Sequence, residues 1–138
     1  MSPQGMNREQ LKQITLDFTE AFNANDLDAV MSYFAEDAVY DQFNDEPARG
    51  VAAIRAAFAP QFEGAFGEMR FDEEDLFIDA EAGRALISWL CKLETKRGPP
   101  GWRGLDILHF DSAGKITAKL TYAKAAQPLM QSVPASRA

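Results

Sequence analysis

The sequence has almost none of the two residue types that build the commonest metal and redox sites. Cys91 is the only cysteine and His109 the only histidine among the 138 residues. A disulfide within the chain is therefore impossible, and zinc sites that combine several cysteines and histidines are excluded by count. Glycine-rich phosphate loops and dinucleotide-binding fingerprints are absent as well. We expect neither a metal nor any other cofactor.

Basic residues and long apolar runs are also scarce. Lysine and arginine number 14 against 21 aspartates and glutamates, which gives a net charge of −7. This balance repels phosphate backbones and anionic membrane surfaces, so we expect no nucleic acid and no membrane as partner. No apolar run reaches the length of about 18 residues that a membrane span needs. Residues 1–7 lack the basic start and the apolar stretch of a secretory signal, so we predict a cytoplasmic protein.

What is present fits a globular domain. Hydrophobic residues make up 46% and charged residues 25% of the chain, close to the average of folded domains. The length suits one domain and not two. We predict a single domain over residues 1–126, followed by a loose tail over residues 127–138, where prolines and small residues accumulate.

Apolar residues recur at spacings of three and four in three N-terminal segments, which is the period of an amphipathic helix. The pattern predicts helices over Met6–Asn23, Leu27–Phe34 and Val51–Phe62. Asp26 is a good N-cap for the second helix, because its carboxylate can accept from the free amides of the first turn. Pro60 is expected to end or kink the third helix near its last turn.

Residues after Gly64 have the character of strands. The predicted strands are 69–78, 84–96, 102–110 and 115–124, preceded by a short strand at 38–43. Short connections make consecutive strands antiparallel. Helices followed by an antiparallel meander form an α+β protein. We expect the sheet to curve around the first helix and to leave a cavity at its wide end, which is the usual place for a small apolar molecule.

Several stretches resemble a known family. Ala24–Val30, Tyr33–Val39 and Asp106–Phe110, together with Glu46–Pro47 and Arg49–Gly50, are similar to the nuclear transport factor 2-like superfamily. The most similar branch is the group of ketosteroid isomerases and SnoaL-like polyketide cyclases. The resemblance implies a cone-shaped α+β roll, with three N-terminal helices packed in the concave face of a curved, mainly antiparallel sheet. It also implies a homodimer formed through the outer face of that sheet.

The resemblance implies a partial set of catalytic residues. Ketosteroid isomerases use an aspartate base, a tyrosine donor and a protonated aspartate donor. Counted along this sequence, Asp106 stands at the position of the protonated aspartate, and Phe18 stands where the family has its tyrosine. Gln42 stands at the position of the base, with Asp41 one residue earlier. The epoxide hydrolases of the superfamily need an acidic residue on the last strand, and residues 118–124 contain none.

The residues themselves also favour Asp106. A strand period of two places Asp106 on one face with Leu108 and Phe110, so its carboxyl is expected to be buried. Burial raises the pKa of a carboxyl, and a neutral carboxylic acid donates a hydrogen bond to an oxyanion or a ligand carbonyl. Two other interpretations stay open, a salt bridge to a neighbour such as Arg103 and a position at the wet mouth of the cavity.

The remaining candidates are a second acid and a set of cavity residues. Asp41 is a candidate general base only if a strand bulge turns it inward, because an unbulged strand points it away from the face that Tyr40 and Gln42 share. The predicted ligand-binding residues are Phe18, Phe22, Tyr33, Tyr40, Gln42, Phe58, Trp89, Trp102, Leu108 and Tyr122.

Two functions of different classes fit these features. The first is a cofactor-free isomerase or cyclase acting on an apolar carbonyl compound, in which Asp106 stabilises an enolate while Gln42 and a tyrosine orient the ligand. The second is a non-catalytic ligand-binding or dimerisation module of the same fold. Apolar Leu105 and Ile107 on the outer face of their strand need cover that the helices cannot supply, which favours a homodimer.

Overall fold

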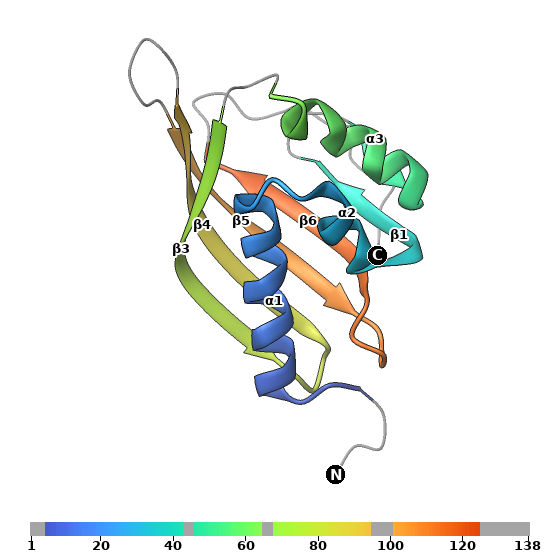
Figure 1. The fold of residues 1–138 in the computed structure, drawn as a ribbon. Helices are drawn as coiled ribbons and strands as arrows, with labels where there is room; N and C mark the ends of the chain where they lie inside the picture. The colour runs from blue at the N-terminus through green and yellow to red at the C-terminus, as the bar shows by residue number, and fades with distance from the viewer. Residues whose placement is uncertain (1–4, 43–45, 65–67, 95–100, 125–138) are drawn as a thin grey trace, which may run out of the picture.

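The computed structural model describes residues 5–42, 46–64, 68–94 and 101–124. The helices are α1 (Arg8–Asn23), α2 (Leu27–Ser32) and α3 (Val51–Phe62). The strands are β1 (Phe34–Asp41), β2 (Ala48–Arg49), β3 (Glu68–Asp79), β4 (Arg84–Glu94), β5 (Gly101–Phe110) and β6 (Ile116–Ala123). The helices lie on one side of a curved, unclosed sheet (Figure 1), so the predicted α+β class is confirmed. None of the helices in these ranges is long and apolar enough to span a membrane.

The sheet has six strands in the order β2-β1-β6-β5-β4-β3. Strands β3 to β6 form the predicted antiparallel meander. The exception is β1, which pairs in parallel with β6 and carries the two-residue β2 on its other edge. The first and last long strands, β1 and β6, are therefore neighbours in the sheet.

Strand β1 begins earlier than its sequence predicts. The apolar pattern predicts helix up to Phe34 and strand from residue 38, whereas α2 ends at Ser32 and β1 starts at Phe34. The Tyr33 carbonyl accepts a hydrogen bond of 2.8 Å from the Ile116 amide, and Phe34 is the register partner of Ile116. Pairing with β6, a distant segment, thus overrides the local helical pattern. The predicted strand residue Phe43 lies outside the described residues.

The helices begin where side chains satisfy their first amides. At α1, the Asn7 side chain accepts from the Gln10 amide at 2.8 Å while the Gln10 side chain accepts from the Asn7 amide at 2.9 Å, a reciprocal capping box. At α2, the predicted cap Asp26 accepts from the Ala29 amide at 3.0 Å. Helix α3 contains Pro60 in its last turn and ends two residues later, as expected.

Aromatic rings form the centre of the core between α1, α3 and the sheet. The Phe22 ring of α1 lies 5.1 Å from the Phe18 ring and 5.2 Å from the Phe58 ring of α3, both edge to face. Phe22 also packs edge to face against Phe71 of β3, at 5.8 Å. Such rings bury large apolar areas and add pairwise attraction. The two long helices and the sheet are thereby joined through one cluster.

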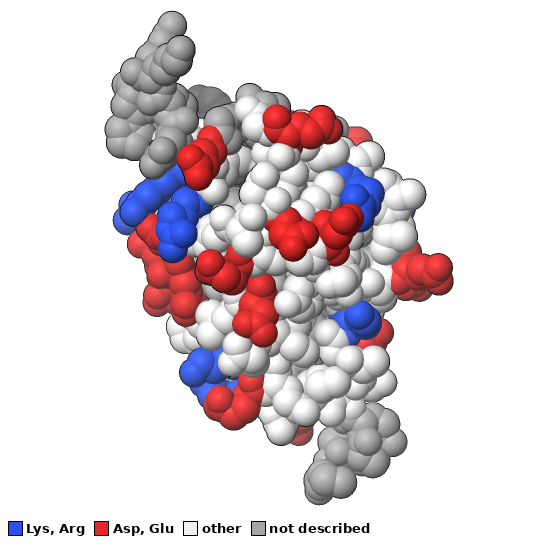
Figure 2. Space-filling view, viewed as in Figure 1, with Lys and Arg blue, Asp and Glu red and all other residues white. Residues whose placement is uncertain are grey.

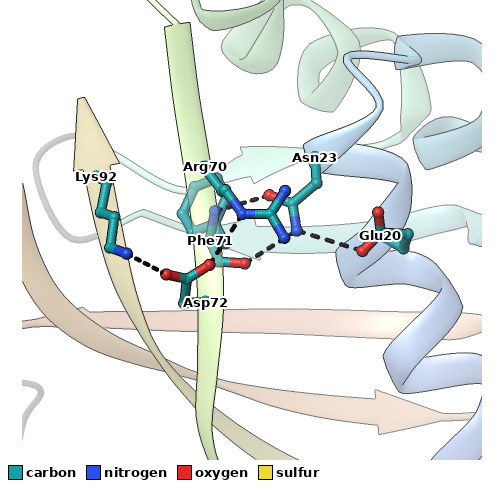
Figure 3. A network of polar contacts seen from close by, with 6 residues as sticks. All are labelled: Glu20, Asn23, Arg70, Phe71, Asp72 and Lys92. Carbon is teal, nitrogen blue, oxygen red and sulfur yellow. Dashed lines mark hydrogen bonds and ion pairs between the residues drawn. The ribbon is translucent and has the colours of Figure 1, made fainter. Parts of the chain in front are cut away.

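The end of α1 is fastened to the free edge of the sheet (Figure 3). The Asn23 side chain accepts from the Phe71 amide at 2.7 Å and donates to the Phe71 carbonyl at 2.9 Å. These backbone groups belong to β3, an edge strand. The neighbouring Asp72 lies between Arg70 and Lys92, and the hydrogen bond from Lys92 is the main cause of its lowered pKa. The side chain of Asn23 thus takes the place of a further strand.

We predict that Asn23→Ala lowers the free energy of unfolding by about 1–3 kcal/mol, because two partly buried backbone groups of β3 lose their partners. Urea unfolding monitored by circular dichroism measures the change. The matched control is Gln13→Ala, which removes an exposed hydrogen bond to Asp17 on the same helix, and its expected effect is within about 0.5 kcal/mol. Equal effects of the two substitutions would contradict the role given to Asn23.

Candidate functional site

A cavity of about 210 Å³ lies between the inner face of the sheet, α1 and α3. Its described lining comes from all strands except β2 and from both long helices. The lining residues are Phe18, Thr19, Phe22, Tyr40, Gln42, Ala57, Phe58, Pro60, Gln61, Met69, Phe71, Trp89, Trp102, Asp106, Lys119 and Thr121. Among these residues only Asp106 and Lys119 carry charge, and they lie together.

The sheet register brings the polar residues of the cavity together. Asp106 of β5 is the register partner of Thr121 on β6. Lys119 is two residues before Thr121 and therefore lies on the same face of β6. Its register partner is Tyr40 on β1. Trp89 lies on β4, the neighbour of β5 on its other side. Four strands therefore contribute one polar side chain or more to the same inner surface.

Asp106 accepts hydrogen bonds from three side chains. Its Oδ1 accepts from Lys119 Nζ at 3.0 Å and from Thr121 Oγ1 at 2.6 Å, and its Oδ2 accepts from Trp89 Nε1 at 3.1 Å. Lys119 Nζ also donates to Thr121 Oγ1 at 2.8 Å. Asp106 is 8% and Lys119 5% exposed. This is a buried ion pair in which the carboxylate is the acceptor and the ammonium the donor.

Aromatic rings surround the ammonium group of Lys119. Its Nζ lies 4.5 Å from the centre of the Tyr40 ring, 5.6 Å from that of Phe58 and 5.8 Å from that of Phe22. The faces of such rings attract cations. Burial by itself lowers the pKa of Lys119, but the charge of Asp106, Tyr40 and the hydrogen bond to Asp106 more than offset this, so the pKa is raised. Lys119 is therefore a cationic donor and not a free amine nucleophile at neutral pH.

Trp89 is held in place by a glycine and a phenylalanine. Gly104 is the register partner of Trp89, and a Cβ atom at position 104 would lie 2.5 Å from Cη2 of the indole. On another side the Phe71 ring packs edge to face at 5.1 Å, and Phe71 is the residue that Asn23 binds. The indole N–H is thereby aimed at Asp106.

Eight of the predicted site residues line the cavity. They are Phe18, Phe22, Tyr40, Gln42, Phe58, Trp89, Trp102 and Asp106. Contact between these side chains and a ligand stays a prediction. Asp106 is buried, as expected, but it forms an ion pair, as in one of the two alternative interpretations, and its partner is Lys119 and not Arg103, which binds Glu74 at 2.9 Å.

Four predicted site residues lie outside the cavity lining. Asp41 is the partner of Leu120, and the irregularity of β1 lies before Val39, so no bulge turns Asp41 to the face of Tyr40. Tyr122 lies on the outer face of β6 and is 55% exposed, because Thr121 takes the inward position.

The other two predicted residues belong to the core. Tyr33 follows α2 and packs edge to face on Phe18 at 5.6 Å, and burial is the main cause of its raised pKa. Leu108 is fully buried two residues beyond Asp106 on β5. Their apolar surroundings were predicted correctly, but the cavity does not extend to them.

Eight lining residues were not predicted, and two of them, Lys119 and Thr121, bind Asp106. The predicted strands 102–110 and 115–124 are joined by a short connection and are therefore antiparallel, and this pairing brings Thr121 opposite Asp106, with Lys119 two residues away on the same face. The sequence signal for Lys119 and Thr121 was therefore their place on the strand that pairs with the strand of Asp106. A lysine in an apolar strand usually extends its ammonium group into solvent, so the burial of Lys119 was not expected from the sequence.

Comparison with known proteins identifies the type of domain. A family profile described as "SnoaL-like domain" matches residues 16–119, which confirms the resemblance drawn from the sequence. A solved structure of SalBIII, described as an epoxide hydrolase/cyclase-like enzyme in pyran ring formation in the polyether salinomycin, superimposes with a TM-score of 0.75. The two chains are 18% identical over 86% of this chain and 93% of that one.

Two further similar structures are proteins of unknown function. One, from Methylobium petroleophilum PM1, has a cystatin-like fold, a TM-score of 0.73 and 22% identity over 95% of this chain and 84% of that one. The other, an NTF2-like protein from Mesorhizobium loti, has a TM-score of 0.70 and 23% identity over 86% of this chain and 93% of that one. At these identities the likeness establishes the fold alone.

We predict that Lys119→Met lowers the free energy of unfolding by about 3–5 kcal/mol, because it leaves the buried Asp106 charge without its cation. The double variant Lys119→Met/Asp106→Leu removes both charges and is expected to recover most of that loss. Urea unfolding of the two single variants and the double variant measures the coupling. If the losses of unfolding free energy in the two single variants simply added in the double variant, the proposed coupling of Asp106 and Lys119 would be contradicted.

The pH dependence follows from the same pair. The folded-state pKa of Lys119 is raised, so its stabilising effect is complete below the unfolded value of about 10.4 and is lost as the pH rises through the folded value. Wild type is therefore expected to lose stability in strong alkali more steeply than Lys119→Met.

Proposed function

The chain belongs to the SnoaL-like domain family, and on this premise we propose that it binds a small apolar carbonyl compound in the cavity and isomerises or cyclises it without a cofactor. The observation that carries the proposal is the contact of 3.0 Å between Asp106 and Lys119 in the wall of an otherwise aromatic cavity. An acceptor of protons and a cationic donor, side by side and shielded from water, are what enolate chemistry needs.

The proposed reaction begins with proton transfer from the ligand to Asp106. A carbon beside the ligand carbonyl gives up its proton to the carboxylate, and the electron pair of the broken C–H bond moves onto the carbonyl oxygen. The Lys119 ammonium donates to that oxygen and stabilises its negative charge. Return of the proton from Asp106 to another carbon completes an isomerisation. In a cyclisation the enolate carbon instead attacks a second carbonyl of the same molecule, whose π electrons move onto its oxygen, and the proton held by Asp106 passes to that oxygen to give a hydroxyl group and restore the carboxylate.

The roles differ from those expected from the sequence. Asp106 was expected to be the donor to the enolate, but its two oxygens accept from Trp89, Lys119 and Thr121. We therefore assign the donor role to Lys119 and the base role to Asp106. Gln42 keeps the proposed role of orienting the ligand, since it lines the cavity and its Nε2 donates to the Glu46 carbonyl at 2.8 Å, which limits its movement.

A non-catalytic binding module is the second candidate. Asp106 and Lys119 satisfy each other, which suits a stable polar wall as well as it suits a reactive pair. In this case the cavity holds its ligand through the same groups but no C–H bond is broken. The similar fold of SalBIII, whose description includes ring formation, supports the enzyme as the first candidate.

We predict that the wild-type protein speeds the conversion of 3-cyclohexenone to 2-cyclohexenone, followed by the rise in ultraviolet absorbance on conjugation. Asp106→Asn should lower the rate by about 10²–10⁴-fold because the base is lost. Lys119→Met should lower it by about 10²–10³-fold because the donor is lost. The control is Lys92→Met, which removes an exposed lysine bound to Asp72. Equal rates in wild type and Asp106→Asn would refute the enzyme and leave the non-catalytic binding module as the remaining candidate.

We further propose that two copies of the chain associate through the outer face of the sheet. Phe77, Leu86, Ile107 and Leu120 are successive register partners on β3, β4, β5 and β6 and form one apolar row across them. Phe77 at one end of the row is 65% exposed. The helices lie on the opposite face (Figure 1), so they cannot cover this row, and a second copy would cover both rows at once.

We predict a dimer of the wild-type protein at micromolar concentration in sedimentation velocity. Ile107→Glu places a charge in the middle of the apolar row, so it should shift the sedimentation coefficient to that of a monomer. The control is Arg55→Glu on α3, which changes charge on the helical side. A wild-type monomer, or a dimer in Ile107→Glu, would contradict the proposed interface.

A further inference from the structure

We propose that the natural ligand of the cavity is an uncharged, compact cyclic molecule with a carbonyl or hydroxyl oxygen, and that carboxylates and steroid-sized molecules are rejected. This inference deepens the proposed function and rests on the same site. It concerns which molecule binds, and it does not require that the bound molecule reacts.

The size of the ligand follows from the cavity. An engineered apolar cavity of about 150 Å³ holds one benzene molecule. By that measure the 210 Å³ of this cavity accommodate roughly eight to ten non-hydrogen atoms. The walls resist expansion because their rings pack on one another, Phe22 on Phe58 at 5.2 Å and Phe71 on Trp89 at 5.1 Å. A molecule of one ring fits, whereas a tetracyclic steroid exceeds the space.

The charge of the ligand follows from the ion pair. Asp106 and Lys119 are nearly excluded from water, and their charges cancel. An uncharged ligand leaves the cavity neutral. A carboxylate adds a negative charge beside Asp106, without a further cation among the described lining residues and with little water to compensate it.

The proposed reaction keeps this balance. When a proton passes from the ligand to Asp106, the negative charge moves from the carboxylate to the enolate oxygen, and both positions lie beside Lys119. The cavity therefore holds no net charge before or after the transfer. A ligand that arrives as an anion would break this balance at the start.

The surface charge works in the same direction. Acidic side chains outnumber basic ones on the helical face of the molecule (Figure 2), and the net charge of the chain is −7. This field lowers the local concentration of anions and does not affect uncharged molecules.

Two neighbouring groups recognise the ligand oxygen. An ammonium has three N–H donors, and two of those of Lys119 are directed to Asp106 and Thr121. The third has no polar partner among the described residues, where only the rings of Tyr40, Phe58 and Phe22 lie near Nζ, and it is the donor for a carbonyl oxygen. Asp106 Oδ2, which accepts from Trp89, has a second lone pair for the proton of a hydroxyl group.

Benzaldehyde and benzoate test the charge selection, because they share one skeleton and differ in charge. Titration calorimetry of the full chain at neutral pH measures both affinities. We expect wild type to bind benzaldehyde at least about tenfold more tightly than benzoate. Asp106→Asn leaves Lys119 as an uncompensated cation, so it should reverse this preference. Lys119→Met/Asp106→Leu keeps the site neutral, serves if the single variant does not fold, and should retain a preference for benzaldehyde.

Estrone, a tetracyclic phenol, tests the size limit in the same measurement and should not bind. Benzoate bound as tightly as benzaldehyde, any binding of estrone in the cavity, or no binding of benzaldehyde would each overturn the proposal. Selective benzaldehyde binding without turnover of 3-cyclohexenone would refute the enzyme and leave this inference intact. Turnover of 3-cyclohexenone together with tighter binding of benzoate than of benzaldehyde would support the enzyme and refute this inference on ligand charge.

Discussion

The contact between Asp106 and Lys119 is the constraint on which the rest of the site depends. Two charges that are less than 10% exposed are tolerated only because each is bound by the other and by neighbouring dipoles. Thr121 donates to the same oxygen of Asp106 as Lys119, Trp89 donates to the other oxygen, and the aromatic rings around Lys119 attract its charge. The apolar walls and the polar pair therefore support each other. Exclusion of water strengthens the attraction within the pair, and the pair places a charged donor and a charged acceptor in an otherwise apolar wall.

The supports of this pair reach to the edge of the sheet. Trp89 lies over Gly104, Phe71 packs on Trp89, and Asn23 fastens Phe71 to the end of α1. The position of the indole N–H is thus set by contacts that begin outside the cavity. Polar groups that must act on a ligand are held most accurately when regular elements position them, and here four strands and a helix do so.

Periodicity alone was sufficient to predict most of the fold. The three helices and the four strands of the meander follow from local patterns of apolar residues and turns. Contacts between distant segments account for what was missed. Strand β1 starts early because Phe34 pairs with Ile116, and Lys119 is buried because its strand lies beside Asp106 and Tyr40. Tyr122, predicted to bind the ligand, lies outside the cavity because strand parity gives the inward position to Thr121, the register partner of Asp106.

The parallel pairing of β1 with β6 has a consequence for how the protein forms. Tyr40 and Lys119 meet only when nearly the whole described chain has been laid down, because the strands that carry them are the first and last long strands of the sheet. Contacts of such high sequence separation close slowly during folding. A chain that has formed its helices and its meander but has not yet docked β1 has no complete cavity. Ligand binding to the complete cavity therefore requires that β1 has docked on β6, and a bound ligand would stabilise this pairing.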